Sequence, residues 1–136
     1  MAGGTAPVIL VHDLEHARAA VAAAGSKRLI LLSPPGAAGL QGPHWWLRLL
    51  ARLRDEFPHA DIVGALDCAD CPGWALAALR SGVERIVLSG DGPAHWAVRQ
   101  AAEQKGAWGE GRWGCDTLDL LGARDPGKTC QEFLQR

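Results

Sequence analysis

The sequence predicts a single α/β domain in which four or five strands run mostly parallel. Short apolar runs alternate with amphipathic segments of helical spacing along the chain, and the connections between them are short. Repeated strand–helix units joined in this way are typical of parallel sheets with right-handed crossovers. At 136 residues, 48% of them hydrophobic, the chain can bury a core as one domain without disulfides or a metal.

The first half of this domain, residues 7–58, contains two predicted strand–helix units. Two short apolar runs predict its strands, Val8–Val11 and Leu29–Leu32. Asp13 is a suitable N-cap for the first helix. Pro43 suits the first turn of the second helix, which is the longest in the chain. The face of that helix with Arg48 and Arg52 is interpreted as a solvated face, because the opposite face is apolar.

The second half, residues 60–106, repeats this pattern, and residues 107–136 form a less regular C-terminal segment. Its two strands are predicted at Ile62–Leu66 and Arg85–Leu88. Prolines suit the first turns of its two helices, at Pro72 and Pro93. In the C-terminal segment, the Gly- and Trp-rich residues 107–115 fit an edge strand or a loop. Asp125-Pro126 predicts a short terminal helix.

The two halves resemble each other, which indicates a doubled βαβα unit. Gly25–Ser33 matches Gly82–Ser89 apart from one extra strand residue, and each segment continues through a Gly-rich loop into a Gly-Pro pair followed by His-Trp. Convergence of glycine caps and helix-opening prolines is the alternative. Two architectures fit the pattern. One is a flavodoxin-like open sheet with helices on both faces, and the other is a half-barrel that must dimerise or close with more strands.

Within the second half, Pro72–Leu88 (PGWALAALRSGVERIVL) resembles one βα unit of the phosphate-binding TIM-barrel enzymes, particularly the keto-deoxy-phosphogluconate aldolase group. The resemblance extends over about Asp61 to Gly90. It implies that a phosphorylated small molecule binds at the carboxyl ends of the strands. It does not imply aldolase chemistry, because the chain has about half the length of a barrel. In addition, none of Lys27, Lys105 and Lys128 falls at a strand's carboxyl end to form a Schiff base.

Polar residues follow the predicted strands, at the edge where parallel sheets bind their ligands. Ser33-Pro-Pro-Gly36 and Ser89-Gly-Asp-Gly92 are turns before helix N-termini, where free amides and the helix dipole favour an anion. We therefore predict a site for a small anionic or phosphorylated ligand, with five candidate residues: Ser33, Gly36, Ser89, Gly90 and Gly92. The alternative is that these glycines only form tight turns.

Two further chemistries are open at the same edge. His12 and Asp67 follow the first and third strands and are candidate catalytic acid–base residues, with Ser33 as a candidate nucleophile. Cys68 and Cys71 form a CxxC motif, a candidate redox or metal site. The sequence favours a structural interpretation of this motif, in which Cys68 is a buried hydrophobic residue and Cys71 is a helix cap.

Three tryptophans lie close to predicted helix starts, where they could stack on a ligand or form an interface: Trp45, Trp74 and Trp96. Trp45 lies off the centre of its helix's apolar stripe and is the better interface candidate. Gly122–Thr129 also fits the pattern G-x-x-x-x-G-K-[ST] of a nucleotide-binding P-loop. Only a short helix can follow it in this sequence, so we interpret the match as chance.

Composition and charge narrow the classes of function. The net charge of −1 gives no basic excess for a nucleic acid, and no apolar run approaches the roughly 20 residues that span a bilayer. The first residues lack the charged and apolar regions of a signal peptide. We therefore expect a cytoplasmic protein with reduced cysteines, no cofactor, and no nucleic-acid or membrane partner. Two functions fit: small-ligand binding at the carboxyl edge, or a non-catalytic homo-oligomeric module, most simply a dimer, held by Trp-rich helix faces.

Overall fold

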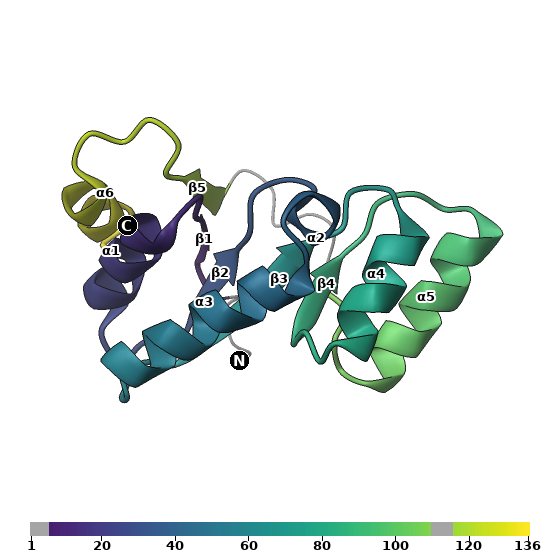
Figure 1. The fold of residues 1–136 in the computed structure, drawn as a ribbon. Helices are drawn as coiled ribbons and strands as arrows, with labels where there is room; N and C mark the ends of the chain where they lie inside the picture. Colours follow the sequence, from purple (N-terminus) through teal and green to yellow (C-terminus); the bar gives the residue numbers. More distant parts are fainter. Residues whose placement is uncertain (1–5, 110–115) are drawn as a thin grey trace.

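The computed structural model describes residues 6–109 and 116–136 and contains one open sheet of five parallel strands, in the order β4-β3-β2-β1-β5 (Figure 1). The strands are β1 (Val8–Leu10), β2 (Leu29–Leu32), β3 (Ile62–Asp67), β4 (Arg85–Val87) and β5 (Thr117–Asp119). The helices of the described residues are α1 (Leu14–Ala24), α2 (Ala37–Leu40), α3 (Pro43–Glu56), α4 (Pro72–Arg80), α5 (Pro93–Gln104) and α6 (Pro126–Leu134). The predicted α/β class and parallel sheet are confirmed.

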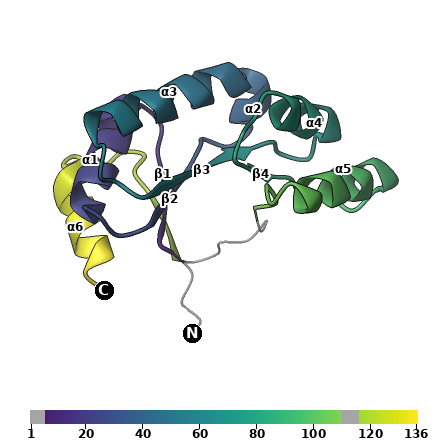
Figure 2. The same cartoon turned by 90° about the horizontal axis from the view of Figure 1, so that it is seen from below.

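The strand order determines where the helices lie. The first four strands are neighbours in chain order, whereas β5 pairs with β1 on its other side. Right-handed crossovers that all step in one direction place their helices on the same face of a sheet. Figure 2 shows α1, α3 and α4 along one face, with α6 packed against α1 at one end and α5 against α4 at the other. No described helix lies across the middle of the opposite face, unlike the two-sided cover expected of a flavodoxin-like sheet.

The core lies between the sheet and the helices that pack against it, and α3 contributes several of its largest side chains. Trp46, Leu50 and Leu53 of α3 are fully buried. Gly64 of β3 lies directly beneath Leu50, so that a Cβ at position 64 would be 2.9 Å from Leu50 Cδ2 and closer still to Cδ1. Glycine at this position therefore allows α3 to pack close to the sheet.

The helix starts agree with the sequence prediction. A proline occupies the first turn of four helices: Pro43, Pro72, Pro93 and Pro126. Proline suits this position because the amide that it lacks has no partner inside the helix, and its fixed φ is already helical. Asp13 caps α1 as predicted, and its Oδ1 accepts a hydrogen bond from the His16 amide at 2.8 Å.

Two features differ from the sequence prediction or extend it. The short helix α2 was not predicted, because Pro34-Pro35-Gly36 before it has the composition of a turn and Gly36 has a φ of 70°. Beside β4, Trp108 forms an isolated bridge with Ile86, while residues 110–115, for which the sequence predicts an edge strand or a loop, lie outside the described residues. None of the described helices is long and apolar enough to cross a membrane.

Candidate functional site

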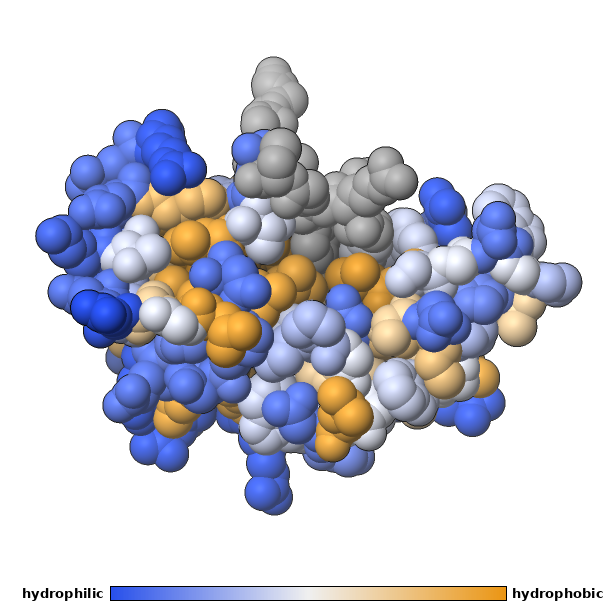
Figure 3. Space-filling view, turned by 90° about the horizontal axis from the view of Figure 1, so that it is seen from above, coloured by the Kyte–Doolittle hydropathy of each residue, from blue (hydrophilic) through white to orange (hydrophobic). Residues whose placement is uncertain are grey.

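The strand order brings the polar strand ends to one edge of the sheet. From one side of the sheet to the other, the row comprises Asp119, His12, Ser33, Asp67 and Ser89. Figure 3 looks onto this edge, where hydrophobic residues reach the surface among hydrophilic ones. Because neighbouring strands are about 4.8 Å apart, direct contacts are expected mainly between adjacent members of the row.

His12 pairs with Asp119, a residue that sequence reasoning missed. His12 Nε2 lies 2.7 Å from Asp119 Oδ1, and the same oxygen accepts a hydrogen bond from the Leu121 amide at 2.9 Å. Asp67, the partner expected from the sequence, lies two strands away on β3. No signal in the sequence alone places β5 beside β1, so the correct carboxylate could have been identified only from the strand order.

Neighbouring groups contact both members of the His12–Asp119 pair. Partial burial raises the pKa of Asp119, but the Leu121 amide and the His12 imidazole more than offset this, so the pKa lies below its ordinary value. The His12 amide donates to His16 Nδ1 at 3.1 Å, and the two imidazole rings meet edge to face. A carboxylate that orients an imidazole in this way is suited to proton transfer. It also ties the edge strand β5 to β1.

Ser33 and Asp67 are adjacent in the row and are joined by a hydrogen bond between the Asp67 backbone and the Ser33 side chain. The fully buried Ser33 accepts a hydrogen bond from the Asp67 amide at 2.9 Å through its Oγ, which donates to the Pro34 carbonyl. Asp67 Oδ1 accepts from the amides of Gly36 and Ala69, at 3.0 and 2.8 Å. The Asp67 carboxylate thus occupies the Gly36 amide, which the sequence predicts to bind an anion.

In the second predicted phosphate loop, Ser89–Gly92, contacts with other parts of the protein likewise occupy Ser89 and Gly90. The Ser89 amide and Oγ both donate to the Ala69 carbonyl, at 2.9 and 3.2 Å. The His95 ring packs against Gly90, where a Cβ would lie 2.5 Å from His95 Nε2, and that nitrogen donates to the Asp70 carbonyl at 2.9 Å. The glycines make room for an imidazole here, and an anion at this loop stays a prediction.

The two cysteines of the CxxC motif have different surroundings. Cys68 is fully buried, and its Sγ lies 3.6 Å from the Leu66 carbonyl, whereas Cys71 is half-buried at the N-cap of α4. Burial, with a smaller effect of the nearby Asp67 charge, raises the pKa of Cys68 to about 12. Within the described part of the chain, no three His, Cys, Asp or Glu side chains are placed to hold a metal ion.

In the native protein we expect iodoacetamide to modify Cys71 much faster than Cys68. A buried thiol with a pKa of about 12 has almost no thiolate at neutral or mildly alkaline pH, and the thiolate is the reactive form. Peptide mass mapping after brief alkylation measures both sites, and a urea-unfolded sample, in which both react, is the control. Rapid modification of native Cys68 would contradict the structural interpretation and support a redox site.

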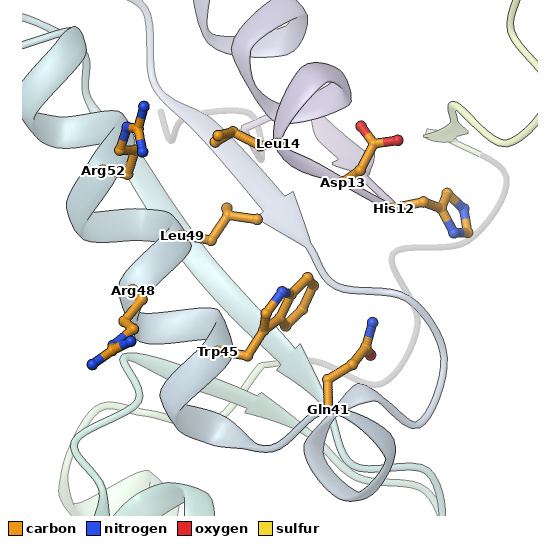
Figure 4. A pocket seen from close by; sticks show the side chains of 8 residues that line it. All are labelled: His12, Asp13, Leu14, Gln41, Trp45, Arg48, Leu49 and Arg52. Atoms are coloured by element: carbon orange, nitrogen blue, oxygen red, sulfur yellow. The ribbon is translucent and has the colours of Figure 1, made fainter.

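A groove of about 550 Å³ lies beside the carboxyl edge, between the start of α1 and α3 (Figure 4). Eight residues line it: His12, Asp13, Leu14, Gln41, Trp45, Arg48, Leu49 and Arg52. In Figure 4, Leu14 of α1 and Trp45 and Leu49 of α3 point toward one another and form an apolar lining, while the His12 ring points away toward β5. Of the predicted catalytic, anion-binding and CxxC residues, only His12 belongs to this groove, and Trp45, for which the sequence predicts stacking on a ligand or an interface, also lines it.

The charges of the groove are unequally neutralised. Arg52 pairs with Glu56 at 3.2 Å, and Arg54 of the same helix pairs with Glu84. Arg48 has no hydrogen-bond or ion-pair partner among the described residues.

Comparisons of the chain with models of protein families and with curated proteins find no match.

The remaining sequence candidates lie away from the groove. In the P-loop-like segment, Asp125 Oδ1 accepts from the Lys128 amide at 3.1 Å and so caps α6, which agrees with the interpretation of a chance match. Trp74 and Trp96 are 37% and 57% exposed, whereas Trp45 is half-buried in the groove wall. The Arg99 guanidinium lies over the rings of both Trp96 and Trp108, 5.8 and 5.0 Å from their centroids.

Proposed function

We propose that this protein binds a small anionic ligand with an apolar or aromatic part, in the groove between α1 and α3. The observation that carries the proposal is the state of Arg48, which lines the groove without an acidic partner among the described residues. A guanidinium binds carboxylates and phosphates through paired charge-assisted hydrogen bonds. The predicted preference for an anion at the carboxyl side of the sheet is thereby retained, but in a place other than the glycine-rich loops.

The apolar lining supports a ligand that is more than a bare anion. Leu14, Trp45 and Leu49 face one another across the groove, and an indole offers a flat surface for an aromatic or aliphatic group. Small-molecule sites commonly combine such a lining with a few polar groups that fix the orientation of the ligand. Gln41 supplies a neutral hydrogen-bonding group at one end.

Asp13 restricts where the negative group can lie. Its carboxylate already accepts a hydrogen bond from the His16 amide and so occupies one of the free amides at the N-terminus of α1. It would also repel a second anion placed at that helix end. The charged end of the ligand is therefore proposed to lie beside Arg48, with its apolar part directed toward Leu14.

Isothermal titration with phenyl phosphate tests the proposal. We expect saturable binding that is about tenfold weaker in Arg48→Gln, because a hydrogen bond to a charged group contributes about 1.5–3 kcal/mol. Inorganic phosphate should bind more weakly than phenyl phosphate, since it cannot use the apolar lining. Trp45→Ala should weaken the binding of phenyl phosphate and leave that of inorganic phosphate unchanged.

Arg124→Gln is the matched control. Arg124 is exposed, lies outside the groove, and has no partner among the described residues, so its loss changes the net charge equally. This variant should bind phenyl phosphate like the wild type. Equal affinity of Arg48→Gln and the wild type, or no saturable binding of either anion, would refute the proposed site.

A further inference from the structure

The outer face of α4 is unusually apolar for a surface helix. No charged side chain occurs from Pro72 to Leu79. Ala75, Ala78 and Leu79 are buried against the rest of the domain, but the opposite side is also apolar and carries Gly73, Trp74, Leu76 and Ala77, all exposed. Surface helices normally carry polar residues on the side that faces water, and a helix that is apolar all round is usually buried.

The neighbouring helix α2 extends this apolar face. Leu40, at the end of α2, is 77% exposed, and it lies close to Trp74 because both side chains approach Gly36. The Trp74 indole is seated on Gly39, where a Cβ would come within 2.5 Å of its ring. Figure 1 shows α2, α4 and α5 side by side at the β4 end of the sheet, and both flanking helices contact α4. We name Leu40, Gly73, Trp74, Leu76 and Ala77 the α4 surface.

We propose that the α4 surface is the interface of a homodimer, in which α4 packs antiparallel against α4 of a second copy across a two-fold axis. The charges at the two ends of the helix identify the occupant. Asp70 precedes α4, Arg80 is its last residue, and both are exposed, with no ion-pair partner among the described residues. A nine-residue helix is about 14 Å long, so an antiparallel copy places each Asp70 close to the Arg80 of the other chain.

The centre of the α4 surface suits the same arrangement. An interface with two-fold symmetry brings the same residues of both copies together near the axis, so a charged residue there would meet a like charge. The residues between the charged ends are uncharged, and Gly73 and Ala77, one helical turn apart, are small enough for two helices to approach closely. Antiparallel helices also align their dipoles favourably. This dimer is independent of the ligand groove, which lies between α1 and α3.

Sedimentation velocity of the full chain, from about 5 to about 500 μM, tests the proposal, since a small interface gives weak association. We expect a concentration-dependent dimer in the wild type. Ala77→Glu, which places a carboxylate against Gly73 of the other copy on each side of the axis, should raise the dissociation constant at least tenfold. Leu121→Glu is the matched control, because Leu121 is 69% exposed and lies outside the α4 surface. Circular dichroism confirms that each variant is folded.

A charge exchange tests the antiparallel arrangement. Arg80→Asp should weaken the dimer, and Asp70→Arg combined with Arg80→Asp should restore it, because both charges are then reversed and the attraction between the helix ends is kept. A wild type that stays monomeric at every concentration overturns the dimer. A dimer that is unchanged by Ala77→Glu overturns the surface, and failure of the double variant to restore association overturns the antiparallel geometry.

Discussion

Gly64→Ala should lower the free energy of unfolding by about 3 kcal/mol, the largest effect we expect from a single methyl group in this domain. A Cβ at position 64 would lie 2.9 Å from Leu50 Cδ2 and closer to Cδ1. Leu50 cannot move aside easily, because α3 is fixed by the fully buried Trp46 and Leu53. The extra carbon therefore forces either a strained rotamer or a shift of the whole helix away from β3.

Thermal and urea unfolding followed by circular dichroism measure this effect, with a melting temperature lowered by roughly 4 °C for each kcal/mol. Gly127→Ala in α6 is the control, because a Cβ there meets only an ordinary contact of 3.7 Å with Asp125 Oδ1. Its stability should be unchanged or slightly raised, since alanine favours a helix more than glycine. If Gly64→Ala unfolded like the wild type, α3 would not pack on β3 as closely as described.

Asp67→Ala should lower the free energy of unfolding by about 2 kcal/mol, because it leaves two amides without their acceptor. Asp67 Oδ1 holds the Gly36 amide of the β2–α2 loop and the Ala69 amide of its own turn. Ala69 has a φ of 52°, a left-handed conformation that non-glycine residues adopt at a cost, and the second hydrogen bond stabilises it. Asp67→Asn keeps an acceptor oxygen, so we expect it to cost less than about 1 kcal/mol.

Asp61→Ala is the matched control for this series. Asp61 is exposed and, among the described residues, its carboxylate pairs only with the exposed Arg28, so its loss should cost less than about 0.5 kcal/mol. Phenyl phosphate titration of Asp67→Asn adds a second measurement. Unchanged binding agrees with a structural Asp67, whereas loss of binding in a fully folded Asp67→Asn would return the ligand site to the β3 loop.

The sequence was sufficient for the elements that local rules determine. Four helices begin at a proline, and β2 has the predicted bounds, because apolar runs and helix-start residues act over a few positions. The short helix α2 escaped prediction for the same reason. The residues Pro34-Pro35-Gly36 are a stronger local signal than the four residues that follow them, and the helix is placed by packing against α4.

The site depended on information that is not local. His12 was correctly placed at a strand end, but its partner Asp119 is 107 positions away, and only the sheet order brings the two together. The helical periodicity of the sequence predicts that the face of α3 with Arg48 is solvated. This face lines a groove because α1 packs alongside α3, which no property of either helix alone reveals.

The pairing of β5 with β1 also affects the protein while it is being synthesised. Strands β1 to β4 leave the ribosome first, and the outer edge of β1, including the Leu10 carbonyl that later accepts the Leu120 amide, then has no partner strand among them. At about 5–20 residues per second, the stretch between β4 and β5 takes roughly 2–6 s to translate. During that interval the nascent chain exposes an open strand edge, which is a template for aggregation with neighbouring nascent chains. The docking of β5 pairs this edge of β1 and leaves the three-residue β5 as the outermost strand on that side.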